Sequence, residues 1–207
     1  MNLFEEDPAP IHLPEAVAGH EAGHAVLAYY HREQIGPTHF DWYGKELGGR
    51  HLHGPPPGIT DERSHVDAAV ERLVAGDLGG RIVAGLPLNR VSIPVARAFL
   101  IGPWTSVTAL AQRIHDARNG EGRHDVVKVM AAIASYKDHK VLWKRRWWRW
   151  FWERVRRSRA VLTSEDGTRA HRLLSAMFHR AIGPSGGVVP GEITVELLRQ
   201  ARAPRGP

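Results

Sequence analysis

The chain has 207 residues, 43% of them hydrophobic, which suits one domain, or one domain with a sizeable insertion, and excludes wholesale disorder. It contains no cysteine, which excludes a disulfide framework and a thiolate metal site, so any metal must be held by His, Asp or Glu. The formal net charge of +6 comes from one local basic patch rather than from a general bias.

The N-terminal stretch, MNLFEEDPAP, is acidic and has no apolar segment typical of a signal peptide. Together with the cysteine-free composition, this predicts a cytoplasmic protein, and residues 1–12 are expected to form a flexible arm. The most apolar stretch, residues 91–111, contains Pro94, Arg97 and Pro103, which favours a buried core segment over a membrane span.

The residues after the arm predict a mainly α fold with one small β-sheet. A first helix is expected from about Pro14, which suits the first helical turn, to His31. Residues 38–53 are expected to form two short strands around Gly44-Lys45, followed by a loop at GPPPG. Further helices are predicted over residues 64–84, 105–118, 169–182 and 192–201, and from 125 to about 135, with a turn-rich connection, GPSGGVVPGE, before the last one.

The first helix carries the sequence HEAGHA, which begins at His20. Because residues i and i+4 lie on the same face of an α-helix, His20 and His24 can direct two imidazoles at one ion. Glu21 stands beside them, where its carboxylate can take a proton from a metal-activated water and later deliver it to a leaving amine. Gly19 and Gly23 cost about 1 kcal/mol each in a helix interior, which indicates close backbone approach there. The pattern therefore favours a catalytic zinc site over two ordinary surface histidines.

A catalytic zinc site needs a third protein ligand, and the residues alone leave several candidates open. The longer HExxHxxGxxH pattern is excluded, because Leu27 and Tyr30 stand where it needs glycine and histidine. The candidates further along the chain are Glu71, Asp77, Asp125 and the pair His51/His53.

The motif HEAGHA followed by VLAYY resembles the peptidase domain of the FtsH-type zinc metallopeptidases, the membrane-bound AAA+ proteases. Three later stretches resemble segments of that family in the same order, namely VAGDLGGRIVAG, GEGRHDVVKV and FHRAIGPSGGVVPGEITVELL. The resemblance implies a peptidase domain over residues 13–203, with a small sheet beside the active-site helix. It also implies that His20, His24 and Asp125 bind Zn and that Glu21 is the general base.

The chain departs from the family pattern in three respects. Gly79, Gly80 and Arg81 stand where the family has an acidic pair, and residues 86–119 form an insertion where it has a short link. Such an insertion is interpreted as a lid, a docking surface or extra core. No Walker A pattern precedes His20, so the resemblance implies cleavage of already unfolded polypeptide or help from an ATPase in trans. Whether the chain forms a homo-oligomer, as the family does, stays open.

Residues 143–157, WKRRWWRWFWERVRR, hold five of the seven tryptophans and seven Lys or Arg residues against one Glu. As a helix, this stretch has too wide an apolar arc for one narrow seam. The tryptophans can pack between helices while the basic side chains reach solvent. They can also form an interface with a partner or second copy, or contact an anionic membrane surface or nucleic acid. The candidate partner-binding residues are Trp143, Arg145, Arg146, Trp147 and Trp150.

Two functions of different kinds are therefore expected to compete. The first is a zinc-dependent metalloendopeptidase that hydrolyses peptide bonds in a polypeptide substrate. The alternative is a non-catalytic binding protein on a degenerate peptidase scaffold, which uses the Trp/Arg-rich helix over residues 143–157 to hold a partner, a membrane surface or nucleic acid.

Overall fold

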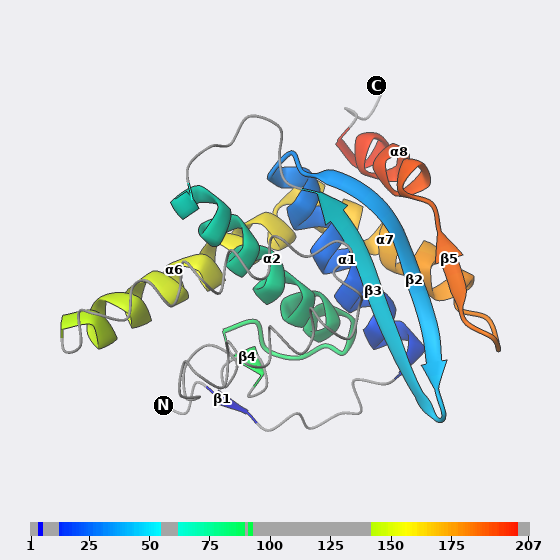
Figure 1. Ribbon diagram of the computed structural model, residues 1–207, viewed down its shortest axis with the longest axis horizontal. Helices are drawn as coiled ribbons and strands as arrows, with labels where there is room; N and C mark the ends of the chain where they lie inside the picture. The colour runs from blue at the N-terminus through cyan, green and yellow to red at the C-terminus, as the bar shows by residue number, and fades with distance from the viewer. Residues whose placement is uncertain (1–3, 6–12, 55–61, 90, 93–141, 203–207) are drawn as a thin grey trace.

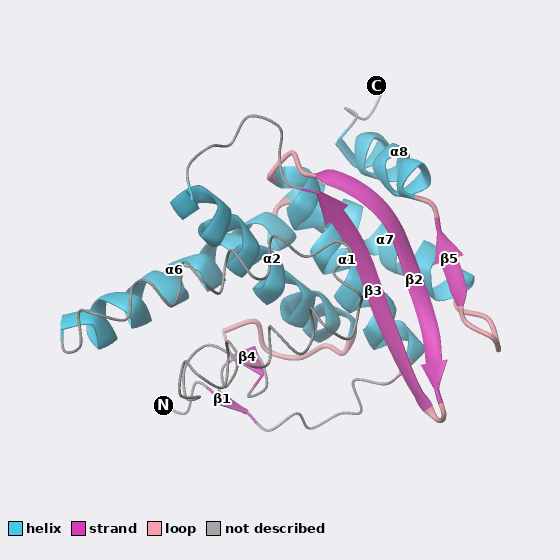
Figure 2. Ribbon diagram, in the orientation of Figure 1, coloured by secondary structure: helices cyan, strands magenta, loops and turns pink. Residues whose placement is uncertain are grey.

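The computed structural model describes residues 4–5, 13–54, 62–89, 91–92 and 142–202 (Figure 1). Its helices are α1 (Pro14–Tyr30), α2 (Glu62–Val83), α6 (Leu142–Thr163), α7 (Glu165–Ala181) and α8 (Gly191–Arg202). Its strands are β1 (Phe4–Glu5), β2 (Gln34–Tyr43), β3 (Glu46–Gly54), β4 (Val91–Ser92) and β5 (Gly187–Val189). The predicted mainly α fold with a small sheet is confirmed (Figure 2). Within these residues, no helix combines the length and the apolar character needed to cross a bilayer.

Several predictions fall outside the described residues. These are the helices over 105–118 and 125–135, most of the insertion over 86–119, and most of the GPPPG loop. Of the predicted arm, Phe4–Glu5 forms β1 and pairs in parallel with β4.

Helix α1 is the central element of the fold, and neighbours surround it on nearly every side. Pro14 occupies its first turn, where the missing N–H costs nothing. The helix ends at Tyr30, and Arg32 then adopts a positive φ of 58° as the chain turns toward β2. Ten of its residues are buried, which is the pattern of a helix that lies inside a core rather than on a surface.

The main sheet has the strand order β3-β2-β5, with both neighbours antiparallel to β2. The predicted hairpin is confirmed, and its turn includes Gly44, which has a φ of 67°. Strand β5 was missed, because three residues within a Gly- and Pro-rich segment are too few to display alternation. Phe40 points inward from β2 and meets Phe178 of α7, with the ring centroids 5.6 Å apart. The β2–β3 hairpin also contacts α1 and runs across it (Figure 2).

Helices α6, α7 and α8 complete the core around α1 and α2. Helix α7 begins at Glu165 rather than at the predicted Arg169, because the Ser164 side chain accepts a hydrogen bond from the Gly167 N–H at 3.1 Å. The largest fully buried side chains contributed by these helices are Phe151, Leu162, Leu174, Phe178 and Leu198.

At their closest approach, α1 and α2 contact each other through main-chain atoms at glycines. A Cβ atom on Gly23 would lie 2.1 Å from the Ala75 carbonyl oxygen, and one on Gly79 would lie 2.3 Å from the Gly19 carbonyl oxygen. Since real Cβ atoms do not approach other atoms so closely, these positions exclude any side chain. The expectation that Gly19 and Gly23 mark close backbone approach is confirmed.

We expect Gly23→Ala to lower the free energy of unfolding by about 1–3 kcal/mol, because its Cβ meets a backbone atom that cannot rotate away. Gly80→Ala is the matched control on the same interface, since its Cβ would have no neighbour closer than 3.5 Å. Alanine also favours a helix over glycine by about 1 kcal/mol, so the control should be neutral or stabilising. Denaturant titration of both variants measures the difference, and equal losses would contradict the interpretation.

Candidate metal centre

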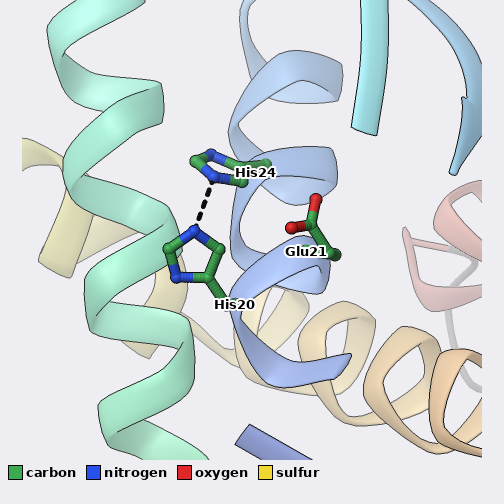
Figure 3. A group of neighbouring side chains, drawn as sticks. All are labelled: His20, Glu21 and His24. Atoms are coloured by element: carbon green, nitrogen blue, oxygen red, sulfur yellow. Dashed lines mark hydrogen bonds between the residues drawn. The ribbon is translucent and has the colours of Figure 1, made fainter. Parts of the chain in front are cut away.

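Helix α1 brings together the three side chains that HEAGH predicts (Figure 3). The Nε2 atoms of His20 and His24 are 3.0 Å apart, and the rings meet edge to face. One potential ligand atom from each of His20, Glu21 and His24 lies within 4.8 Å of the other two. In Figure 3 the imidazoles point toward α2, and Glu21 lies on the side away from α2. His20 and His24 are half-buried.

The second ring nitrogen of His24 is held by α2. Its Nδ1–H donates a hydrogen bond of 2.9 Å to the Arg72 carbonyl oxygen. This bond fixes the ring tautomer, so that Nε2 carries a lone pair toward His20. A backbone or carboxylate acceptor on the far nitrogen is the usual companion of a metal-binding histidine.

A glycine on α2 provides the space in front of the two rings. A Cβ atom on Gly76 would lie 2.5 Å from Nε2 of His24 and 2.8 Å from Nε2 of His20. Any other residue at this position would therefore push a methyl group against both candidate ligand atoms. Gly76 was not singled out from the sequence, although VAGDLGG combines three glycines at spacings that place them on the same face of one helix.

Glu21 is buried against the opposite neighbour, strand β3. Its side chain is 4% exposed, and a Cβ atom on Gly49 would lie 2.5 Å from its Oε1. Burial raises the pKa of Glu21 to about 8, and the backbone N–H of His51, which hydrogen-bonds to the carboxylate, opposes this shift. Within the described part of the chain, Oε2 has no hydrogen-bond partner. A buried carboxylate with one unsatisfied oxygen is costly unless a cation or a water pairs with it.

The electrostatics of the site keep its histidines neutral. Burial lowers the pKa of His20, although the charge of Asp77 partly opposes this, and it lowers the pKa of His24 further still. The nearby His51, whose pKa burial lowers to about 4, is also neutral. Since metals bind unprotonated imidazole, the site holds its two nitrogen donors in the form that a metal needs.

The donor set fits zinc. Zinc takes nitrogen and oxygen ligands at about 2.0–2.2 Å, and two imidazole nitrogens at a tetrahedral angle would be about 3.3 Å apart. The observed 3.0 Å separation needs only a small adjustment to match this. The space in front of Gly76 and the unsatisfied Glu21 oxygen are both features that a bound cation would explain.

The structure reduces the number of candidates for the third ligand, but the identity of this ligand stays a prediction. Glu71 is engaged elsewhere, because its carboxylate lies 3.1 Å from His31 and 3.3 Å from Arg154 beside a separate cavity of about 610 Å³. Within the described residues, the metal-competent group contains neither Asp77 nor His51. Asp125, which the resemblance implies, and the side chain of His53 lie outside the described part.

Part of the Trp/Arg-rich helix packs in the interior of the protein. Trp150 donates to Asp67 at 2.7 Å, Arg154 pairs with Asp67 and Glu71, and Phe151 is fully buried. Trp150 therefore packs between α6 and α2, and its partner-binding role stays a prediction. The side chains of Trp143, Arg145, Arg146 and Trp147 lie outside the described part of α6, so their partner-binding role stays a prediction.

No protein-family model and no curated protein matches the chain.

We expect Gly76→Ala to weaken zinc binding by at least about 10-fold, because the added methyl group displaces both Nε2 atoms. The fold should survive, since the contacted atoms are the ends of side chains that can rotate. Competition against a chromophoric chelator measures the affinity, and Gly80→Ala should leave it unchanged. Wild-type affinity in Gly76→Ala would show that no ion lies in front of this residue.

The raised pKa of Glu21 predicts a pH-dependent stability in the metal-free protein. The unfolded carboxyl has a pKa of about 4.3, so between this value and about 8 only the folded state keeps the proton. Stability is therefore lost as the pH rises through this window. Glu21→Gln cannot ionise, and we expect its thermal stability relative to wild type to rise between about pH 5 and about pH 8.5 in chelator. Parallel curves for the two proteins would contradict the assignment.

Proposed function

We propose that this protein is a zinc-dependent metalloendopeptidase, with His20 and His24 as zinc ligands and Glu21 as the general base. The observation that carries the proposal is the convergence of two neutral imidazole Nε2 atoms and one buried carboxylate within 4.8 Å. The resemblance of HEAGHA and three later stretches to the FtsH-type peptidases supports the same reaction. The proposed third ligand is Asp125.

The residues of the chain have distinct roles in this proposal. A zinc ion, when bound, acts as a Lewis acid and lowers the pKa of a coordinated water to about 7. Glu21 takes the proton from the attacking water and passes it to the amine that leaves. The His51 N–H and the backbone at Gly49 hold the carboxylate in place. Arg72 holds His24 through its carbonyl oxygen.

The position of β3 supports a polypeptide substrate. Among the strands that the structure describes, in the order β3-β2-β5, β3 lies at the edge, and Gly49 within it contacts Glu21. An extended peptide can add to the edge of a sheet through main-chain hydrogen bonds. A substrate strand paired with β3 would run past the proposed general base, with its amide groups near Glu21.

Further features of the proposal come from the resemblance alone. They are a substrate that is already unfolded or is delivered by an ATPase in trans, and assembly into a homo-oligomer. The proposed cytoplasmic location comes instead from the cysteine-free composition and the acidic N-terminal stretch. The non-catalytic binding protein is the alternative, and the internal contacts of Trp150 do not favour it.

We expect purified protein to bind about one zinc per chain, and His20→Ala or His24→Ala to abolish this binding. Glu21→Gln should retain zinc and lose about 10²–10⁴-fold in turnover of a labelled, unstructured polypeptide, since it removes only the proton transfer. His179→Ala is the matched control, because this histidine is exposed on α7 and lies outside the metal-competent group.

Elemental analysis and a cleavage assay test these expectations together. A wild-type protein that cannot be loaded with zinc would overturn the proposal. Zinc binding without cleavage of any unstructured polypeptide would favour the binding-protein alternative instead.

A further inference from the structure

The cavity of about 610 Å³ is separate from the candidate metal centre. Its lining comes from α1, α2, α6, α7 and α8 and includes none of His20, Glu21 and His24. Pockets that hold small organic ligands have volumes of about 300–1,000 Å³, and this cavity falls within that range. A ligand that fills it would bury an apolar body against one part of the wall. That part is formed by Val26, Ala68, Ala160, Val161, Ala170 and Leu198.

The acidic side chains that line the cavity are already compensated within the protein. The Glu71 carboxylate lies 3.1 Å from His31 and 3.3 Å from Arg154. Asp67 pairs with the same arginine at 2.5 Å. The third acid, Asp166, lies in the first turn of α7, where the helix dipole stabilises a negative charge. These contacts leave little demand for a cationic ligand.

The arginines that line the cavity differ in this respect. Arg154 pairs with the two buried acids of α2, and Arg157 pairs with Glu153 at 2.8 Å. Arg202, which is exposed at the end of α8, has no acidic partner among the described residues. Its guanidinium carbon instead lies over the Tyr29 ring, 4.9 Å from the ring centre. A guanidinium in this position keeps planar N–H donors that can bind both oxygens of a carboxylate.

We propose that the cavity binds a small monocarboxylate with an apolar body. The carboxylate pairs with Arg202, and the body packs against the apolar wall. The cation–π contact with Tyr29 holds the guanidinium in place before the ligand arrives, which reduces the side-chain freedom lost on binding. A free carboxylic acid and the C-terminal residue of a peptide both have this chemistry. The inference does not depend on the proposed zinc site.

The first test compares probes of matched shape on the full-length protein by isothermal titration calorimetry. The free acid is 4-phenylbutyrate, and its control is 4-phenylbutan-1-ol, which has the same apolar body without the charge. An acetylated tripeptide that ends in phenylalanine, compared with its C-terminal amide, represents the peptide source. We expect each acid to bind at least about 10-fold more tightly than its neutral control, because a charged hydrogen bond is lost in the control. The acid that binds more tightly identifies the source.

The second test removes the proposed carboxylate partner. We expect Arg202→Gln to weaken binding of the tighter acid by at least about 10-fold. Arg202→Lys should lose less, because it keeps the charge but not the planar fork. Arg199→Gln is the matched control, since this arginine is exposed on the same helix, lies outside the cavity lining and should leave the affinity unchanged. Amide chemical-shift changes in the wild type should concentrate at Val161 and Ala170 of the cavity wall.

Three results would overturn the inference. They are the failure of both acids to bind at millimolar concentration, equal affinities for an acid and its neutral control, and equal losses in Arg202→Gln and Arg199→Gln. Shift changes confined to the β2–β3 hairpin would place the ligand elsewhere and would overturn it as well. None of these measurements requires zinc or a cleavage assay, so their outcome is independent of the proposed peptidase.

Discussion

The crossing of α1 and α2 is the constraint on which the site depends. Gly19 and Gly23 on one helix meet Ala75 and Gly79 on the other with backbone atoms in direct contact. The close approach of the two helices brings the Arg72 carbonyl within hydrogen-bond distance of His24. A crossing widened by one methyl group would remove that bond and separate α2 from both rings. His171 of α7 strengthens the crossing, because its ring donates to the Gly19 carbonyl at 3.0 Å and also bonds the Gly79 backbone.

Burying three ionisable side chains in the hydrophobic core destabilises the fold, and this cost favours a functional role for them. A carboxylate and two imidazoles occupy positions on α1 that are otherwise filled by Ala, Val and Leu. Burial holds all three groups in their neutral forms when no metal is bound, since it raises the pKa of Glu21 and lowers those of His20 and His24. In the proposed zinc site, a divalent ion would lower the pKa of Glu21 and would bind the neutral histidines directly.

The remaining buried charges of α2 belong to the framework of the fold. Asp67 and Glu71 pair with Arg154 of α6, and Arg72 pairs with Glu33 at the start of the sheet. These contacts fix α2 against α6 and against the chain that leads into β2. The residues of α2 thus have two roles. Some hold this helix against the core, and others contact the histidines of α1. Breaking one partner of such a buried pair leaves the other charge unpaired, which is strongly destabilising.

By itself, the sequence determined what depends on local periodicity. The HEAGH helix, the convergence of His20 and His24, the hairpin and the mainly α class all follow from spacings of two to four residues along the chain. Asp125 was selected among the candidate third ligands only through the resemblance, and it lies outside the described residues. Only the tertiary structure decided that Gly76 faces the imidazoles and that the Arg72 carbonyl oxygen accepts a hydrogen bond from His24. It also decided that Glu71 pairs with His31 and Arg154, and that β5 joins the sheet. These contacts join residues far apart along the chain, and which helix face meets which neighbour is settled by the packing of the whole core rather than by any local pattern.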